Sequence, residues 1–419
     1  MAIAVVAVVV VLGLLGVGGF VYFRHQGGDA AATRVREPGN TLTRDWEQSV
    51  PRTQPSGTGL TGLPGLWAVN QTVVFADGGG VRGFDGATGA PKWTLKPPDH
   101  VGRPCAMSWR ATANGLGAVA YDAGGGDCSV IAAVDTNAGT VLWSKNLAGG
   151  VKSSTPILTA NDNMITADLG QAGVTRFDAR LGTTLPLPRP APHSGECTKR
   201  YALADYHGVM TSDCPGEGVT VFSQLDTKGG NDSYPADGRK VLAVLGEDPV
   251  TVLFETDSEH RWIQTFTHEG AGKLIELTGE LEKFHFDSRC RMVADKHLLI
   301  AEYQQTHGYA ALDLNTGRLL WRTPAGKIYR LVDDISPDQV LFVTDGDTTG
   351  GVAGHQDLIA YDLKSDQPTV KGALTRPDGH SPGPAAGCEF VKAPGRLLTV
   401  CESSEQPGTN SIDSYGVYH

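Results

Sequence analysis

The sequence predicts an all-β chain that folds into a ring of four-stranded blades, a β-propeller. Three observations predict this class. A turn motif recurs in register, with Gly four residues after Asp and Trp eight residues after it. Turn-forming residues are abundant, with Gly 54 and Pro 24 among 419 residues. Between these turns lie short segments rich in β-branched residues, such as Thr72-Val73-Val74, which are typical of strands.

The turn motif is complete in three places. The Asp of such a turn can accept hydrogen bonds from backbone N–H groups, and the Gly can take a positive φ. The Trp then begins the outermost strand of the blade, where its large ring can pack against the next blade. We therefore interpret three sets as blade-docking residues: Asp85, Gly89 and Trp93; Asp135, Gly139 and Trp143; and Asp313, Gly317 and Trp321.

Weaker forms of the motif set the number of blades. They begin at Asp178, Asp226, His268, Asp362 and Asp413. Successive motifs are 42 to 51 residues apart, on average about 47, which is the length of a four-stranded blade. Eight motifs therefore predict eight blades, and seven blades are the alternative count.

The two ends of the chain predict how the ring closes. Only six residues follow Asp413, so the last blade lacks an outermost strand. Residues 42–50, which include Trp46, resemble such a strand but lie before the first blade. We predict that this strand pairs with the last blade and completes it. The propeller then spans 41–419, and residues 24–40 form a flexible linker.

The N-terminal segment, 1–23, predicts a transmembrane helix that anchors the chain. No charged side chain occurs among the 22 residues from Ala2 to Phe23. As a helix these residues would extend about 33 Å, enough to cross the hydrocarbon core of a bilayer. A signal peptide cleaved near Ala30–Ala32 stays open as the alternative. We expect a single-pass protein of the cell membrane, with the propeller on the extracytoplasmic side.

The cysteines also indicate export. There are seven, and none forms a Cys-x-x-Cys pair, so zinc and thioredoxin-like sites are not indicated. Their positions in the repeat predict three disulfides between neighbouring strands, each stabilising by about 3 kcal/mol: Cys105–Cys128, Cys197–Cys214 and Cys388–Cys401. Cys290 has no partner position and is predicted to be a buried thiol. The alternative is that all seven are buried small apolar residues.

Charge and local motifs exclude several functions. The net charge of −11 argues against nucleic acid, whose phosphates need a basic surface. Asp345-Gly346-Asp347 begins like a calcium loop, but Gln356 stands where a bidentate Glu is needed, so a blade turn is the simpler interpretation. Gly379–Gly383 has the letters of a nucleophile elbow. However, Pro382 lacks the N–H that an oxyanion hole requires.

A few isolated residues are open to two interpretations. Lys199 and Arg200 could line a rim of the ring, and His285 and His297 could face its channel. Scattered surface or turn positions are the simpler explanation for all four. No motif therefore carries catalytic chemistry. The ends of the ring and its central channel, where propellers usually bind, are the expected location of function.

The repeat resembles a known family. A blade that ends in Asp, then Asn or Thr, then Gly, then three residues and Trp is similar to the pyrroloquinoline-quinone-type repeat. Asp135–Trp143 and Asp313–Trp321 carry the resemblance best, and it extends over roughly 41–419. It implies an eight-bladed propeller. The family includes quinoprotein alcohol dehydrogenases, the propeller lipoprotein of outer-membrane protein assembly, and sensor domains of bacterial kinases, so an anchored member resembles a bacterial envelope protein.

The resemblance also bears on cofactors and activity. The dehydrogenases of this family typically hold the quinone against a disulfide between adjacent cysteines, above a calcium site. This chain has no Cys-Cys dipeptide, which argues against pyrroloquinoline quinone with calcium, and we predict no cofactor. The expected function is a non-catalytic binding, scaffold or sensor module for a protein or envelope ligand. The alternative is an enzyme, either a quinoprotein-like oxidoreductase or a propeller lyase.

Overall fold

The computed structural model describes most of the region predicted as a propeller. The anchor 1–23 and most of the linker 24–40 lie outside the described residues. No helix that is long and apolar enough to cross a membrane occurs within the described part of the chain. The described residues are 35–36, 41–51, 66–77, 79–124, 127–147, 156–169, 173–187, 198–204, 207–214, 218–222, 233–235, 239–247, 249–256, 260–267, 269–286, 290–293, 298–303, 308–324, 327, 329–333, 339–345, 356–363, 368–375, 388–393, 396–402 and 412–418.

The prediction of an all-β fold is confirmed. In the residues that the structure describes, the one helical segment is a short 3-10 turn, η2 (Gly279–Lys283). Each of the first sheets is built from four strands that are consecutive in the chain. The first three sheets contain β3 (Leu66–Val69), β4 (Thr72–Asp77), β5 (Gly80–Asp85) and β6 (Pro91–Leu95); β7 (Pro104–Met107), β8 (Leu116–Tyr121), β9 (Val130–Asp135) and β10 (Thr140–Asn146); and β11 (Ile157–Ala160), β12 (Met164–Asp168), β13 (Val174–Asp178) and β14 (Thr184–Leu185).

The next three sheets follow the same plan, with an interruption in the sixth. There the innermost position is divided between two short strands, β23 and β24, which both pair with β25. The strands are β15 (Thr198–Ala204), β16 (His207–Cys214), β17 (Gly218–Phe222) and β18 (Ser233–Pro235); β19 (Lys240–Glu247), β20 (Val250–Glu255), β21 (Arg261–Thr267) and β22 (Gly270–Glu276); and β23 (Phe284–His285), β24 (Arg291–Val293), β25 (Leu298–Tyr303), β26 (Gly308–Asp313) and β27 (Arg318–Arg322).

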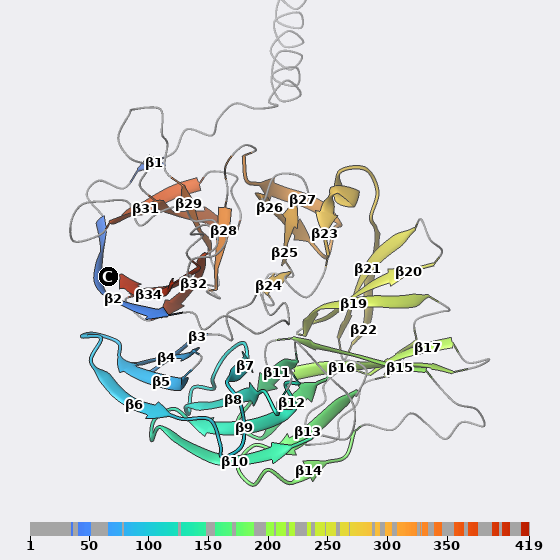
Figure 1. Ribbon diagram of the computed structural model, residues 1–419. Coiled ribbons are helices and arrows are strands. Elements are labelled where there is room, and N and C mark those ends of the chain that lie inside the picture. The colour runs from blue at the N-terminus through green and yellow to red at the C-terminus, as the bar shows by residue number, and fades with distance from the viewer. Residues whose placement is uncertain are drawn as a thin grey trace, which may run out of the picture.

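The remaining strands differ from the prediction of separate blades, because they form one nine-stranded sheet. It contains β28 (Tyr329–Asp333), β29 (Gln339–Asp345), β30 (Gln356–Asp362), β31 (Pro368–Thr375), β32 (Cys388–Ala393), β33 (Arg396–Glu402), β34 (Ile412–Tyr418), β2 (Thr41–Pro51) and the two-residue β1 (Val35–Arg36). Parallel pairs join β28 to β32 and β2 to β31, so that all of these strands except β1 form a closed barrel, visible at the upper left of Figure 1. Innermost strands of neighbouring blades run in the same direction, and they can therefore pair wherever they approach closely.

The N-terminal strand completes the sheet of the C-terminal strands. β2 pairs antiparallel with β34, from Arg44 opposite Tyr418 to Pro51 opposite Ile412. Arg44 is only 6% exposed, and its Nε and Nη2 donate to the Tyr418 hydroxyl at 3.1 and 2.8 Å. Arg44 also forms an ion pair with Glu47. The two ends of the chain are therefore held together by a ladder and by a buried guanidinium.

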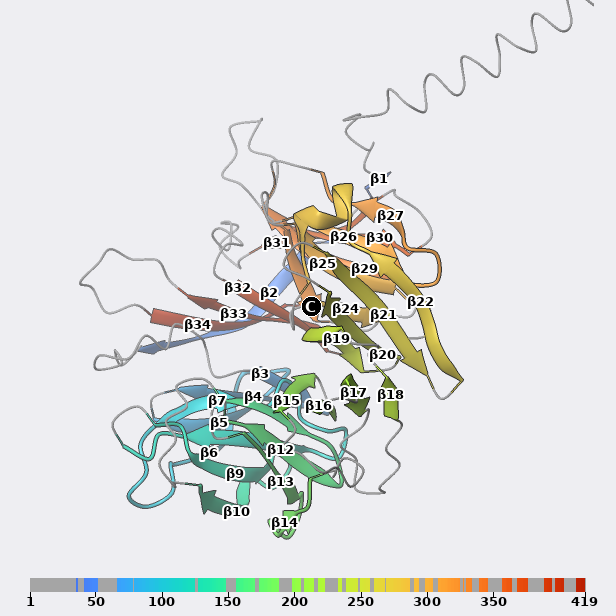
Figure 2. The same ribbon diagram turned by 90° about the vertical axis from the view of Figure 1, so that its right-hand side faces the viewer.

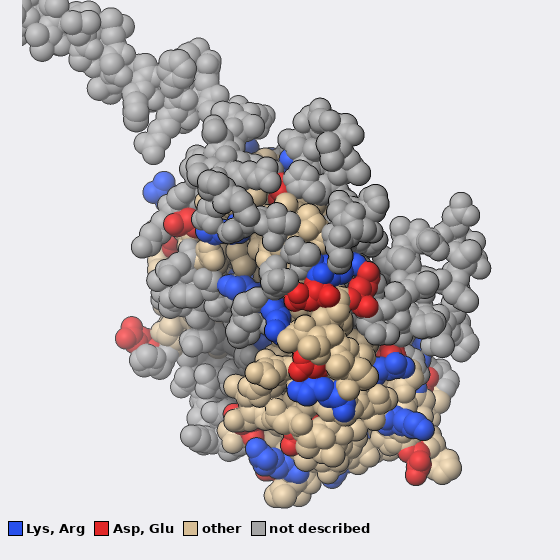
Figure 3. Space-filling model, turned by 90° about the vertical axis from the view of Figure 1, so that its left-hand side faces the viewer, with Lys and Arg blue, Asp and Glu red and all other residues tan. Residues whose placement is uncertain are grey.

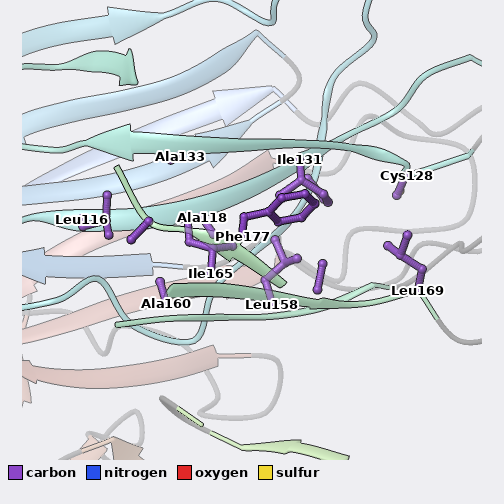
Figure 4. Packing of buried hydrophobic residues seen from close by; sticks show 13 residues of the cluster. Leu116, Ala118, Cys128, Ile131, Ala133, Leu158, Ala160, Ile165, Leu169 and Phe177 are labelled. Carbon is purple, nitrogen blue, oxygen red and sulfur yellow. The ribbon is translucent and has the colours of Figure 1, made fainter. Parts of the chain in front are cut away.

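Hydrophobic clusters join most of the described sheets to a neighbour. Between the second and third sheets, Ile131 and Ala133 of β9 pack against Leu158, Ile165 and Phe177, as Figure 4 shows. Similar clusters join the first sheet to the second, the fifth to the sixth, and the sixth to β28–β31. A further cluster joins β33 and β34 to the first sheet. The sheets thus follow one another round a central region (Figures 1 and 2).

Candidate functional site

The repeated turn is held together by its own aspartate. The Asp85 Oδ1 atom accepts hydrogen bonds from the backbone N–H of Ala87 and of Thr88, both at 3.0 Å, and from the Thr88 hydroxyl at 2.9 Å. These bonds, the Thr88 hydroxyl first among them, lower the pKa of Asp85 below its ordinary value. Gly89 closes the turn with a φ of 69°, a conformation that glycine adopts without strain.

The same hydrogen bonds recur in the other described turns. Asp135, Asp178 and Asp313 each accept from the two backbone N–H groups that lie two and three residues later, at 2.8 to 3.2 Å. Their glycines, Gly139, Gly182 and Gly317, have φ between 64° and 73°. The motif is therefore a local structure, formed within five residues, that places a glycine at a fixed position on the rim.

Tryptophans connect the turns of the second and third sheets to the preceding sheet. The Trp93 indole N–H donates to the Thr136 carbonyl at 3.1 Å, and a Cβ built on Gly139 would lie 2.3 Å from the Trp93 ring. Trp143 makes the equivalent contacts with Ala179 and Gly182 in the third sheet. Each ring therefore lies on the glycine of the next turn, which has no side chain to exclude it.

Trp46 makes the same contacts for the closing strand. Its indole N–H donates to the Gly86 carbonyl at 3.3 Å, and its ring lies 2.7 Å from the position of a Cβ on Gly89. β2 therefore provides the tryptophan that packs on the turn of the first sheet, in place of an outermost strand after Asp413.

Trp321 is the exception among the predicted docking residues. It is buried and stacks on Tyr361, with ring centroids 4.8 Å apart, but its indole N–H has no hydrogen-bond partner among the described residues. The following motif has Asp366 in place of the glycine, outside the described residues. The side chain of Ile275, in the fifth sheet, lies beside Gly317, where the turns of the first three sheets have a tryptophan. The motif of the fifth sheet has no Trp eight residues after His268.

The structure contains the first predicted disulfide, Cys105–Cys128, whose Cα atoms are 6.2 Å apart. Cys388 is also disulfide-bonded, and it lies directly opposite Cys401 in the β32–β33 ladder. The predicted pair of Cys197 with Cys214 falls on residues outside those that the structure describes. Cys290 is a buried thiol that donates to the His285 carbonyl at 3.5 Å.

Tyr121, in the strand beside this disulfide, carries a testable electrostatic feature. Its ring is fully buried, its hydroxyl has no hydrogen-bond partner in the described chain, and burial raises its pKa from 10.0 to about 12. A raised pKa in the folded state means that the neutral phenol is favoured there. Its ionisation therefore costs no stability below pH 10, and the folded state loses stability as the pH rises from 10 towards about 12.

We predict that Tyr121→Phe raises the free energy of unfolding at pH 8 by about 1 kcal/mol, because it removes a buried hydroxyl without a partner. The variant should also lose less stability than the native chain between pH 10 and 12. Urea unfolding at pH 8 and at pH 11 measures both effects. A variant that is less stable at pH 8 would indicate that the hydroxyl is hydrogen-bonded after all.

The centre of the ring contains a contact between sheets that are not neighbours. Trp109 follows β7 of the second sheet, and Arg291 begins β24 of the sixth. The Arg291 guanidinium carbon lies 4.7 Å from the centroid of the Trp109 ring, close enough for a cation–π interaction. Figure 1 places β7 and β24 on facing sides of the central region. Trp109 remains 39% exposed, so part of the indole is available to a ligand.

The loop that presents Trp109 is held rigidly. The Trp67 indole N–H donates to the Ser108 carbonyl at 2.7 Å, and the Ser108 hydroxyl donates to the Arg110 carbonyl at 2.8 Å. The backbone N–H of Ser108 donates to the Ala118 carbonyl at 2.8 Å. Trp109 is thus fixed between two anchored residues, which limits the entropy lost when it is covered by a partner.

Sequence reasoning did not single out Trp109 or Arg291. A signal was nevertheless present, because Trp109 is one of the tryptophans that lie outside the Asp-to-Trp register. A large aromatic residue with no role in blade docking needs another explanation, and an exposed loop position near the axis is one.

The contact of Arg291 with Trp109 does not fit the quinone that the resemblance implies. The guanidinium of Arg291 stacks directly on Trp109, which leaves no layer between them for a flat ring system. Among the described residues, moreover, no group of three His, Cys, Asp or Glu side chains could hold a metal ion.

The other candidate residues are dispersed. Lys199 and Arg200 lie in β15, the innermost strand of the fourth sheet, and His285 is exposed at the end of β23. His297 and most of the calcium-like loop after Asp345 lie outside the described residues, as does Gly379–Gly383. On the face seen in Figure 3, basic and acidic side chains of the described residues alternate without a large patch of one sign.

Comparison with known proteins places the repeat in a family. Residues 78–371, more than half of the chain, match the family model described as outer membrane protein assembly factor BamB. The fold is similar to BamB from Moraxella catarrhalis, with a TM-score of 0.45 and 11% identity over 90% of this chain and 99% of that chain. It is also similar to the quinohemoprotein alcohol dehydrogenase ADHIIG from Pseudomonas putida HK5, with a TM-score of 0.47 and 10% identity over 90% of this chain and 76% of that chain. No curated protein matches the sequence.

Proposed function

Because the chain belongs to the family described as outer membrane protein assembly factor BamB, we propose that it is a non-catalytic scaffold that binds a protein partner. In this proposal the ring has eight blades, with β28–β31 as the seventh and β32–β34 plus β2 as the eighth. The apolar segment 2–23 anchors it in the cell membrane, and the ring lies on the extracytoplasmic side. The disulfide Cys105–Cys128 supports this location, since disulfides persist in oxidising compartments.

The observation that carries the proposal is the exposed Trp109 against Arg291. Tryptophan and arginine are the side chains most enriched among the residues that dominate protein–protein binding energy. Here Trp109 is held before any partner binds on a loop that hydrogen bonds fix. Arg291, at the start of β24, lies against its ring. A partner that covered the exposed part of the indole would bury apolar surface at little cost in conformational entropy.

Photo-crosslinking in the native membrane tests this role. A photoreactive amino acid in place of Ala111, two residues after Trp109 in the same loop, should yield a specific crosslinked protein from the full chain. Trp109→Ala should reduce the yield at least about tenfold, which corresponds to a loss of about 1.4 kcal/mol. The control is the same photoreactive residue at Leu320, an exposed position on β27, the outermost strand of the sixth sheet.

Two results would contradict the scaffold proposal. One is the same crosslinked protein, in equal yield, from the Ala111 and Leu320 positions and from the Trp109→Ala variant. The other is tight, stoichiometric binding of pyrroloquinoline quinone with calcium to the purified full chain, measured as a thermal shift, which would favour the oxidoreductase alternative.

A further inference from the structure

The outermost strands of the sheets expose rows of backbone N–H and C=O groups. Such edges can pair with a strand from another chain, and natural proteins usually protect them with proline, charge or short length. In the described part of the chain, β6, β10, β14, β18, β22 and β27 each end a sheet. Their sequences differ in how well they protect the edge.

Most of these edges carry a recognisable protection. β6 begins with Pro91, and β18 has only three residues and ends with Pro235. β14 consists of two residues, and β27 has Arg318 and Arg322 at its two ends. β22 contains two glycines and Lys273. Each of these features disfavours the addition of another strand.

β10 lacks these protections. It has seven residues, no proline and one charged side chain, Lys145. The Lys145 ammonium lies 5.9 Å from the centroid of the Phe177 ring, over the adjacent sheet and not out along the edge. Leu142 of β10 is 39% exposed, and Leu181, on the turn that receives Trp143, is 74% exposed. Apolar side chains thus accompany the open backbone.

The pairing of β10 leaves a regular edge for a further strand. The ladder with β9 has one irregularity, between Val141 and Trp143, and is regular from Trp143 to Asn146. β10 pairs with β9 alone among the described strands. It lies at the lower margin of the molecule in both Figure 1 and Figure 2, where no other described sheet faces its outer edge.

The protein already shows a strand added to an outermost edge. β31 is the fourth strand of the group that begins with β28, and it pairs with β30. The segments Val35–Arg36 and Thr41–Thr43, which come from the other end of the chain, both pair with β31 in parallel. An extended segment that is distant in sequence is therefore accepted at the position that corresponds to β10.

We propose that β10 is a strand-addition site for an extended segment of a partner protein whose alternate side chains are apolar. Backbone hydrogen bonds to β10 would give affinity, and contacts with Leu142 and Leu181 would favour apolar side chains. The inference rests on the proposed scaffold role but concerns a surface separate from Trp109.

A peptide-binding experiment on the full chain tests the site. The probe is a short fluorescent peptide of alternating Thr and Val. We expect saturable binding, together with slower hydrogen exchange of the amides of 142–146 when the peptide is present. Leu142→Lys combined with Ser144→Lys should weaken binding at least about tenfold, because charge at both exposed positions disfavours an added strand.

The matched control is Leu320→Lys, which changes the residue before Trp321 as Leu142→Lys changes the residue before Trp143. Binding of the peptide should change less than about twofold, since β27 already has arginines at its ends. Equal weakening by both variants, or no protection of 142–146, would overturn the proposal. Sedimentation and crosslinking that showed β10 pairing only with β10 of a second copy of the chain would also overturn it. If the Trp109 loop gave no crosslinked partner but the peptide still bound β10, the proposed interface at Trp109 would be contradicted and the strand-addition site would not.

Discussion

A chain that begins at residue 52 is expected to lose at least about 5 kcal/mol of its free energy of unfolding, or to fail to fold cooperatively. β2 is the strand that completes the sheet of β32–β34. Its removal takes away the ladder with β34, the buried Arg44 and the ring of Trp46 on the first sheet. Loss of a large packed aromatic side chain alone costs about 3–5 kcal/mol, and a typical domain has only about 5–15 kcal/mol in total.

Complementation separates this effect from general damage by truncation. A synthetic peptide of residues 41–51, added to the chain that begins at residue 52, should restore the cooperative urea transition. The same peptide with Trp46→Ala should restore it poorly, because it can pair with β34 but cannot fill the space on Gly89. A truncated chain as stable as the full chain would show that β2 does not close the ring.

The second large effect is expected at Gly139, where alanine should cost about 3 kcal/mol. Gly139 has a φ of 64°, which costs a residue with a Cβ about 1–2 kcal/mol. The added Cβ would also lie 2.3 Å from the Trp93 ring, so the ring must move and its hydrogen bond to Thr136 must lengthen. Overpacking of this kind costs about 1–3 kcal/mol more.

Gly173→Ala is the matched control for the backbone term. Gly173 has a φ of 78°, but no atom of the described residues lies within 4 Å of its Cβ position. We expect it to cost about 1 kcal/mol, from the backbone alone. Urea unfolding of both variants gives the difference, which measures the contact of Trp93 with Gly139. Equal losses would mean that this contact contributes nothing to the docking of the two sheets.

The repeat could be predicted from the sequence because its turn is local. Asp135, the two backbone N–H groups that it binds and Gly139 all lie within five residues, so spacing alone identifies them. The same spacing placed Trp93 and Trp143 on outermost strands, although each lies inside its strand and not at the predicted start. The register could not show which carbonyl each indole would bind, because Thr136 and Ala179 belong to the following sheet.

The candidate site could not be predicted from the sequence, because its residues are not close to each other in the chain. Trp109 and Arg291 belong to no motif, and they meet only because the second and sixth sheets face each other across the centre. The weak protection of β10 is similar. The lack of proline and of charge in β10 is visible in the sequence. That β10 ends its sheet, with β9 as its one described neighbour, is known only from the structure.

The sequence by itself determined the all-β fold, the repeated turn with its Asp and Gly, and the pairing of Cys105 with Cys128 within one unit. These features depend on hydrogen bonds and spacings within one unit, so the spacing of the residues in the sequence is enough to predict them. Only the tertiary structure decided that the last strands join in one closed sheet, that Arg44 is buried against Tyr418, and that Trp109 meets Arg291. Those contacts join segments distant in the chain, and their geometry is set by how the sheets pack.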